Sequence, residues 1–414
     1  MNKKYIAAVI GGGAAGIAAA ISCSEKLGKG STVIIEKQSR IGRKLLATGN
    51  GRCNISNNRL SEANYHGDKK ILSEVLSFYT LNKERKFLSE MGLILRDDNE
   101  GRLYPYSNRA STVLDCFRYR LNKNDVTELC DFHIISINKE NEVFRISSES
   151  DTIFAKYVIF ATGSPSSPSL GADETGYKIL DKFGIKKTPV FPSLSPVFCK
   201  EKSKILKGVR AKGKVFVIAD GRTVSSRTGE IQFTENGLSG ICVFDLSRNI
   251  NEYFKTGFID GKKYSDVSLS VDLMPEYNES DIVGYLRKCR SFFADRESAD
   301  FLSALFDRKL SSYICTYSGI NNKICNKITE NEIKRIAGSV NNLIFTPEKI
   351  SSYNNSQVCA GGYDSRSVFP DTLMCRKINN LFICGELLDV DGDCGGYNLH
   401  FSIGSGLLAA RSIK

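Results

Sequence analysis

The chain has 414 residues, of which 41% are hydrophobic and 25% charged, and its formal net charge is +11. This length exceeds what one hydrophobic core usually supports, so we expect two or three domains in an ordinary globular protein. No apolar stretch reaches the roughly 18 residues that a membrane span needs, and the first strand leaves no room for a signal peptide. We therefore expect a cytoplasmic protein without a membrane partner.

Charge and cysteine content exclude further classes. Basic residues are scattered among acidic ones with no run of five, so the net charge favours attraction of small anions and makes nucleic acid an improbable partner. The 13 cysteines include no C-x-x-C pair, and the chain has three histidines. We expect no metal site and no redox dithiol. Cys53 and Cys394 lack a partner at redox-motif spacing, so we expect no thiol chemistry from either.

The first 36 residues follow the order strand, glycine turn, helix, strand, acid. Residues 5–10 are apolar and lead into Gly11-Gly12-Gly13-Ala14-Ala15-Gly16, and a second apolar run, 32–35, ends at Glu36. In a G-x-G-x-x-G turn, the first glycine permits the tight turn, the second lets the backbone approach a pyrophosphate, and the third allows close packing of the helix on the strand. An acidic residue at the end of the second strand, here Glu36, binds a ribose hydroxyl. The pattern predicts a site for the ADP part of FAD or NAD. The alternative is a glycine turn that opens an ordinary βαβ unit.

The next part of the chain alternates helical and extended patterns. Residues 40–54 are rich in Gly, Asn and Arg, whose donors suit a phosphate or a flavin edge, although a surface loop has the same composition. The periodicity predicts helices over 69–92 and 111–121. It predicts strands over 132–137, 142–148 and 152–160, the last of which runs into Ala161-Thr162-Gly163.

From Pro189 the pattern becomes that of antiparallel sheet. Extended segments are predicted over 214–219, 223–226, 231–234 and 267–273, and residues 279–340 are mostly helical in pattern. A strand-rich and helix-rich unit is therefore expected inside the chain, from about 191 to 344.

The last 35 residues again have the pattern of a strand, a glycine-containing turn and a helix. A buried-strand run, 381–384, precedes Gly385-Glu386, an acidic loop and Gly395-Gly396-Tyr397-Asn398 at the start of an apolar helix. Glu386 is placed to bind ribityl or ribose hydroxyls. The N–H groups of the helix beginning near Gly396 could face the flavin N1/C2=O edge, where negative charge collects on reduction. A tight turn before a buried helix explains the two glycines as well.

Taken together, residues 11–36, 42–54, 229–240 and 385–399 resemble the BaiN/YhiN-type bacterial FAD flavoproteins, also known as aminoacetone-oxidase-like oxidoreductases. The resemblance implies an α/β fold with a Rossmann-like FAD-binding domain in two segments, 1–190 and 345–414. Between them it implies a β-rich, barrel-like domain, 191–275, and a small helical domain, 276–344. Two positions depart from the family: Asn50 stands where Gly is usual, and His400 where Gln is usual. A core or helix-capping role is the favoured interpretation of His400.

The resemblance also implies non-covalent FAD. The matching contacts are Gly11, Gly13, Ala15, Gly16, Glu36, Lys37, Lys44, Asn50, Gly51, Arg52, Cys53, Gly163, Gly385, Glu386, Asn398 and Leu399, with His133 and Ile134 on a strand that meets adenine through its backbone. The neighbouring residues Ala161, Thr162, Asp391, Gly395, Gly396 and Tyr397 complete the predicted cofactor site. No catalytic side chain is assigned.

These features predict an FAD-dependent oxidoreductase that transfers hydride at flavin N5 to or from a small organic substrate. Two directions stay open: reduction of an activated C=C bond driven by NAD(P)H, or oxidation of a small amine with dioxygen. No second G-x-G-x-x-G follows a strand, so NAD(P)H would dock transiently. The alternatives are a tRNA-modifying or nucleic-acid-associated flavoprotein and a non-catalytic flavin-binding protein. The oligomeric state is left open.

Overall fold

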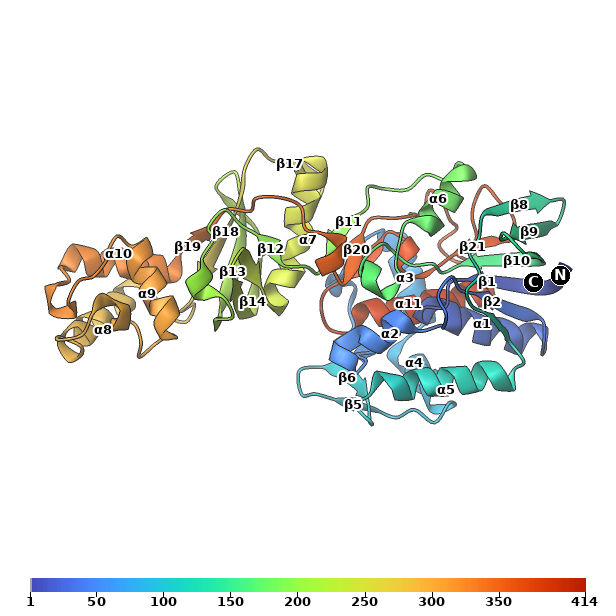
Figure 1. Cartoon of the computed structure of the whole chain (residues 1–414), viewed down its shortest axis with the longest axis horizontal. Helices are drawn as coiled ribbons and strands as arrows, with labels where there is room; N and C mark the ends of the chain where they lie inside the picture. The colour runs from blue at the N-terminus through green and yellow to red at the C-terminus, as the bar shows by residue number, and fades with distance from the viewer. Residues whose placement is uncertain (1) are drawn as a thin grey trace. The chain divides into compact units, whose positions relative to one another are not determined.

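The computed structural model describes residues 2–414, which form two compact units (Figure 1). The first unit contains residues 2–191 and Gln357–Lys414, and the second contains Pro192–Ser356. The chain leaves the first unit at β11 (Phe191–Ser193) and is back in it at β20 (Val358–Ala360).

A seven-stranded, mostly parallel sheet forms the centre of the first unit. The strand order is β7-β2-β1-β10-β9-β8, and β21 pairs with the last part of β10. The strands are β1 (Asn2–Ile10), β2 (Thr32–Ile35), β7 (Thr127–Leu129), β8 (Ser136–Glu140), β9 (Val143–Ser147), β10 (Thr152–Phe160) and β21 (Leu381–Ile383). Because β1, β2, β10 and β21 are parallel, their carboxyl ends meet at one edge of the sheet, where α/β folds bind ligands.

Two helices from opposite ends of the sequence, α1 (Ala14–Leu27, blue) and α11 (Tyr397–Arg411, red), pack against each other in this unit (Figure 1). A Cβ atom on Gly406 would lie 2.2 Å from the carbonyl oxygen of Ala15, so the two backbones nearly touch. Lys26 Nζ donates to the carbonyl of Arg411 at 2.8 Å, so the carboxyl ends lie together and the helices run in the same direction. The contact involves Ala15, the second residue of α1, but Gly406, the tenth residue of α11. The N-terminus of α11 therefore extends beyond that of α1.

Among its described residues, the first unit also contains five further α-helices. They are α2 (Arg43–Ala47), α3 (Lys69–Phe78), α4 (Leu81–Ser89), α5 (Ala110–Lys123) and α6 (Thr175–Lys182). α5 confirms the helix predicted over 111–121, but the single helix predicted over 69–92 is wrong. Tyr79 leaves the helical conformation at φ −111° and ψ 78°, and the Thr80 hydroxyl then accepts a hydrogen bond from Lys83 N, which caps α4.

Small sheets complete the first unit. One contains β3 (Ser56–Asn57), β5 (Leu95–Asp97) and β6 (Arg102–Pro105), and the other pairs β4 (Tyr65–Gly67) with β22 (Val390–Gly392). The second pairing brings residues from both segments of the first unit together. It places His66 opposite Asp391.

In the second unit, six strands form one sheet in the order β12-β15-β14-β13-β18-β19. They are β12 (Val197–Phe198), β13 (Arg210–Ala219), β14 (Arg222–Thr234), β15 (Gly237–Ser239), β18 (Val267–Asp272) and β19 (Leu343–Phe345). The strands predicted over 223–226 and 231–234 are one continuous strand, β14. Backbone bonds of 2.8 Å from Lys200 N to Thr346 O and from Glu348 N to Phe198 O join the two edges, as expected of a barrel-like domain.

The second unit also contains helices that share the core of its sheet. They are α7 (Ile241–Thr256), α8 (Glu279–Phe292), α9 (Arg308–Tyr317) and α10 (Glu330–Asn341), and a short hairpin pairs β16 (Phe258–Ile259) with β17 (Lys262–Lys263). One hydrophobic cluster includes Val215 of the sheet, Leu286 of α8 and Ile336 of α10. The predicted division of this region near residue 275 stays a prediction. Across residues 2–414, the helices are too short or too polar to cross a membrane.

The α1–α11 contact predicts opposite effects for two helical glycines. Gly406→Ala places a methyl group against the Ala15 carbonyl and should lower the free energy of unfolding by about 1–3 kcal/mol. A Cβ atom on Gly338 in α10 would meet nothing within 4 Å, so Gly338→Ala should raise that free energy by up to about 1 kcal/mol. Urea unfolding of both variants checks this. Equal effects would contradict the packing described here.

Candidate cofactor site

The three fingerprint glycines have different reasons to lack a side chain. A Cβ atom on Gly11, whose φ is +102°, would lie 2.5 Å from the Ala161 carbonyl oxygen, and one on Gly16 would lie 1.9 Å from the Gly11 carbonyl oxygen. A Cβ atom on Gly13 would meet no protein atom within 4 Å. Packing of the chain therefore explains Gly11 and Gly16, whereas Gly13 borders open space where a ligand could approach.

The start of α1 suits a phosphate. Gly13 is its N-cap residue, no side chain caps it, and no acidic residue stands in its first turn. The N–H groups of that turn and the partial positive charge of the helix end are thus available to an anion. Beside them, Glu36 Oε2 accepts a hydrogen bond of 2.7 Å from Gly12 N, and Oε1 accepts one of 2.9 Å from Gln38 N. These bonds fix the carboxylate beside the glycine turn.

A cluster of polar side chains lies at the ends of β10 and β21. Lys44 Nζ is 2.8 Å from Glu386 Oε2, which also accepts a hydrogen bond of 3.0 Å from Ser164 Oγ. The Thr162 hydroxyl is buried without a partner of its own. A Cβ atom on Gly385 would lie 2.9 Å from that of Ala15, which places this cluster next to α1. Such an unpaired hydroxyl fits a site that a polar ligand completes.

Backbone strain marks the predicted loop between residues 48 and 54. Asn50 has φ +54° and ψ +44°, and Cys53 has φ +61°. Asn tolerates this left-handed conformation better than most residues, which explains how Asn50 can stand where the family usually has Gly. Arg52 lies over the ring of Tyr104 at 4.7 Å, and Gly51 has φ +82°.

Cys53 is fully buried in this loop. Burial is the main reason that its pKa is raised from 9.0 to about 12, and the nearby carboxylate of Glu84 raises it further. Its thiol is therefore protonated at neutral pH and is a poor nucleophile.

The strand predicted to carry His133 and Ile134 differs from expectation. The strand predicted over 132–137 begins only at Ser136, because Asp131 turns the chain at φ +54°, so His133 and Ile134 are not on a strand. The backbone just before them lies beside the ribose-binding candidate, since Phe132 N donates to the Glu36 carbonyl at 3.0 Å. Lys37 forms an ion pair with Asp173. Cofactor contacts at His133, Ile134 and Lys37 stay predictions.

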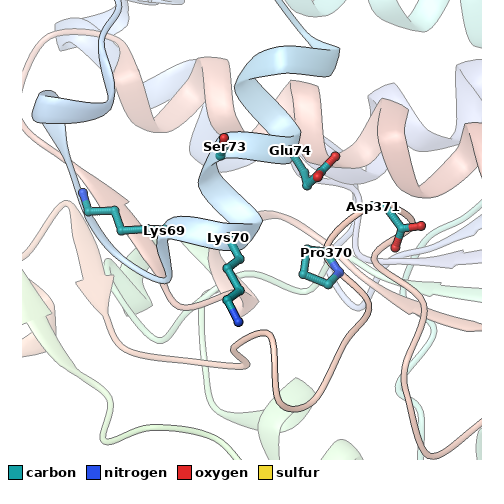
Figure 2. A pocket seen from close by; sticks show the side chains of 6 residues that line it. All are labelled: Lys69, Lys70, Ser73, Glu74, Pro370 and Asp371. Atoms are coloured by element: carbon teal, nitrogen blue, oxygen red, sulfur yellow. The ribbon is translucent and has the colours of Figure 1, made fainter.

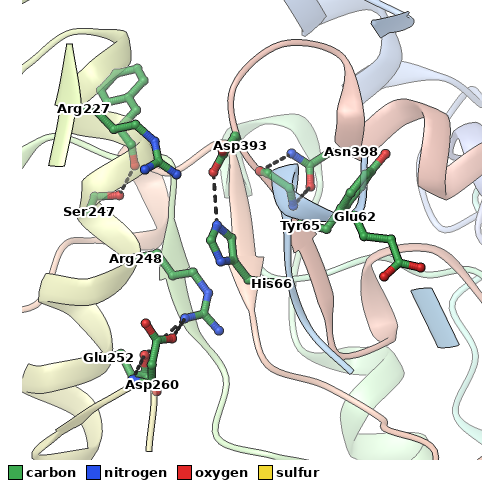
Figure 3. A network of polar contacts seen from close by, with 12 residues as sticks. Glu62, Tyr65, His66, Arg227, Ser247, Arg248, Glu252, Asp260, Asp393 and Asn398 are labelled. Carbon is green, nitrogen blue, oxygen red and sulfur yellow. Dashed lines mark hydrogen bonds and ion pairs between the residues drawn. The ribbon is translucent and has the colours of Figure 1, made fainter. Parts of the chain in front are cut away.

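Around the start of α11, predicted residues are held by bonds to other residues of the chain. The Asn398 amide accepts a bond of 2.9 Å from Gly392 N and donates one of 2.8 Å to Gly392 O, and His66 Nε2 lies 3.0 Å from Asp393 Oδ1 (Figure 3). Asp391 is buried on β22, and the Tyr397 carbonyl accepts from the Tyr65 hydroxyl at 3.0 Å. Leu399 is partly buried.

The two glycines before α11 also have reasons within the protein. Gly395 has φ +137° and Gly396 has φ +98°, and a Cβ atom on Gly396 would lie 2.3 Å from the Ser56 carbonyl oxygen. The expectation that Gly396 admits a flavin is thus not needed to explain this residue. Replacement of Gly396 would test packing rather than flavin contact.

Ser164 and Glu84 belong to this region but were not predicted from the sequence pattern. Ser164 directly follows the predicted turn Ala161-Thr162-Gly163, so its position was a usable signal. Glu84 lies one turn before the buried Leu88 of α4, on the apolar face of the helix, and is itself fully buried. It lies beside His400, whose predicted core position is confirmed because its side chain has no exposed surface.

A pocket of about 520 Å³ lies elsewhere in the first unit, between α3 and the 370–371 turn (Figure 2). It is lined by Lys69, Lys70, Ser73, Glu74, Pro370 and Asp371. None of these is among the predicted cofactor residues.

Because a side chain at residue 13 would extend into open space, substitution of Gly13 tests ligand binding directly. Gly13→Ala should leave the unfolding temperature of the apoprotein unchanged and weaken FAD binding by roughly tenfold or more, about 1.4 kcal/mol. Flavin fluorescence titration measures the affinity, and Gly338→Ala is the matched control. Unchanged affinity in Gly13→Ala would place the pyrophosphate elsewhere.

The buried thiol gives a second prediction. Cys53→Ser should retain substantial flavin reduction by the physiological donor, since the Cys53 pKa of about 12 leaves little thiolate at neutral pH. Stopped-flow absorbance of the flavin band measures the rate. A thousandfold loss with FAD still bound would show that this thiol takes part in the chemistry.

Comparisons with known proteins identify the family of this chain. The family model described as HI0933-like protein Rossmann domain matches residues 5–412. A 3-dehydro-bile acid delta(4,6)-reductase from Clostridium scindens is 33% identical over 412 residues, which cover 98% of each chain. A ribosomal RNA dihydrouridine synthase from Haemophilus influenzae is 26% identical over 411 residues, again 98% of each chain.

Among solved structures, the E. coli quinol fumarate reductase FrdA superimposes with a TM-score of 0.50 at 12% identity, over 100% of this chain and 70% of that one. This likeness concerns the fold alone. The family match spans both segments of the first unit and the unit inserted between them. The chain therefore belongs to the HI0933-like family of Rossmann flavoproteins and is an FAD-dependent oxidoreductase.

Proposed function

We propose that this chain reduces a C=C bond conjugated to a carbonyl group in a small organic substrate, with NAD(P)H as a transient electron donor. The observation that carries the proposal is the 33% identity, over 98% of both chains, to a protein named as a bile acid delta(4,6)-reductase. The name of a second relative, a dihydrouridine synthase, also describes reduction of a C=C bond next to a carbonyl, that of uracil.

The arrangement of α1 and α11 supports a long cofactor. Both helices start near the carboxyl edge of the sheet and run in the same direction, and α11 extends beyond α1. The first turn of α1 would bind the pyrophosphate, and Glu36 would accept hydrogen bonds from the adenosine ribose. The N-terminus of α11 would then stand further along, where its partial positive charge suits the flavin N1/C2=O edge.

Other residues of the site would orient the cofactor and keep water away. The Lys44–Glu386 pair can bind hydroxyls or phosphate without a change in net charge. FAD supplies hydride transfer at N5 when it is bound. The chain itself would contribute binding, orientation and a fixed electrostatic field.

Spectroscopy under anaerobic conditions tests the proposed reaction. NADH or NADPH should bleach the flavin band, and a steroid acid with a 3-oxo-4,6-diene should restore it and gain hydrogen across a C=C bond, as mass spectrometry would show. The saturated 3-oxo steroid acid is the control and should leave the flavin reduced.

Bleaching by aminoacetone with reoxidation by dioxygen, but none by either nicotinamide, would favour an amine oxidase. A protein that binds FAD but is reduced by none of these donors would favour a flavin-binding role without turnover.

RNA modification is the second candidate, since the dihydrouridine synthase relative matches along its length and the net charge here is +11. In that case ribosomal RNA should bind with an affinity that falls steeply between two salt concentrations, and dihydrouridine should accumulate in the RNA. If the protein neither binds ribosomal RNA nor forms dihydrouridine, but does turn over the steroid acid, RNA modification is excluded.

A further inference from the structure

His400 and Glu84 form a buried pair behind the first turn of α11. Both side chains have no exposed surface, and His400 Nδ1 lies 3.2 Å from Glu84 Oε1. His400 is the fourth residue of α11, and Glu84 lies on α4. Neither Glu84 oxygen has a well-directed hydrogen bond to any described residue. A buried carboxylate in this state requires an explanation.

The surroundings of His400 determine where its protons are. His400 Nε2 lies 2.8 Å from the Tyr79 carbonyl oxygen, which can only accept, so Nε2 carries a proton. His400 Nδ1 faces both Glu84 and the hydroxyl of Ser56, which is 3.0 Å away and can donate or accept. One further proton, on Nδ1 or on the Glu84 carboxylate, makes the pair neutral. Without it, an uncompensated negative charge would be fully buried.

Three further titratable groups near Glu84 carry no positive charge. They are Cys53, Tyr65 and Tyr79, and the pKa of each is raised mainly by burial, with the Glu84 charge as a further cause. Each of these groups is neutral at neutral pH. His400 is thus the basic group that meets Glu84.

The pair also links the start of α11 to three other segments of the first unit. His400 contacts Ser56 of β3, Tyr79 after α3 and Glu84 of α4, and the Ser56 carbonyl lies against Gly396 at the start of α11. The Tyr79 and His400 rings lie 4.9 Å apart. Displacement of His400 would therefore move the helix end that the proposed function assigns to the flavin.

We propose that Glu84 and His400 hold one proton between them and act as positioning residues, which fix the first turn of α11 for the flavin half of FAD. This inference rests on the FAD site of the proposed function. It assigns no role to either residue in hydride transfer.

Nitrogen-15 NMR of histidine-labelled full-length protein tests the shared proton. In the wild type, either His400 Nδ1 or the Glu84 carboxyl should carry this proton, as the nitrogen-15 signal of Nδ1 and the carbon-13 signal of labelled Glu84 would show, and Glu84→Gln should change the Nδ1 signal. Addition of FAD should shift the signal, whereas ADP, which lacks the flavin, should not. Absence of a proton from both Nδ1 and the Glu84 carboxyl in the wild type, or equal shifts with FAD and ADP, would overturn the proposal.

FAD affinity provides the second measurement. Glu84→Gln and His400→Gln should each weaken binding about tenfold, and the double variant should lose little more because the pair acts as one unit. Glu90→Gln removes an exposed charge at the end of the same helix and is the matched control. Affinity in Glu84→Gln equal to that in Glu90→Gln would overturn the proposal.

The wild-type NMR experiment still decides the case if Glu84→Gln does not fold. Neither measurement depends on the reduction reaction. A protein that binds FAD as expected but reduces no C=C bond would therefore contradict the proposed function and leave the role of the Glu84–His400 pair intact.

Discussion

The close contact between α1 and α11 is the constraint on which the rest of the first unit depends. Gly406 allows the Ala15 carbonyl to approach, and this brings a helix from the start of the sequence beside one from its end. The sheet imposes the same closure, because β21 pairs with β10, which pairs with β1. The N-termini of α1 and α11 therefore lie at the same edge of the sheet. One would meet the phosphates of a long cofactor and the other its redox-active end.

Charge in this site is arranged in small, locally balanced groups. Lys44 faces Glu386, Lys37 faces Asp173, and His400 faces Glu84. Helix ends provide the remaining electrostatic field, and their backbone dipoles need no reorganisation when charge develops nearby. This distribution suits a flavoprotein whose cofactor performs the chemistry. The buried thiol of Cys53 agrees with this view, because it is protonated where a reactive cysteine would be ionised.

Local sequence patterns predicted the parts of the fold that depend on local chemistry. The turn at Gly11–Gly16, the strands on either side and the helix α5 follow from spacing and periodicity within short windows. The break at Tyr79 was missed because the apolar periodicity continues across it, while a cap at Thr80 starts a new helix. The turn at Asp131 was missed because its left-handed backbone leaves no mark in hydrophobicity. Glu84 could not be recognised, since its partner is 316 positions away in sequence and only the fold brings them together.

The discontinuous first unit also constrains how the protein is made. β21 and α11 leave the ribosome only after the whole second unit, so the edge of β10 that β21 covers stays unpaired while the inserted unit folds. Contacts between such distant segments form slowly, because a long loop must close before they gain stability. The second unit carries its own hydrophobic core and can condense during that delay. The whole second unit must therefore be synthesised before a flavin can be captured, and nascent chains pass through a stage with an unpaired sheet edge to which chaperones can bind.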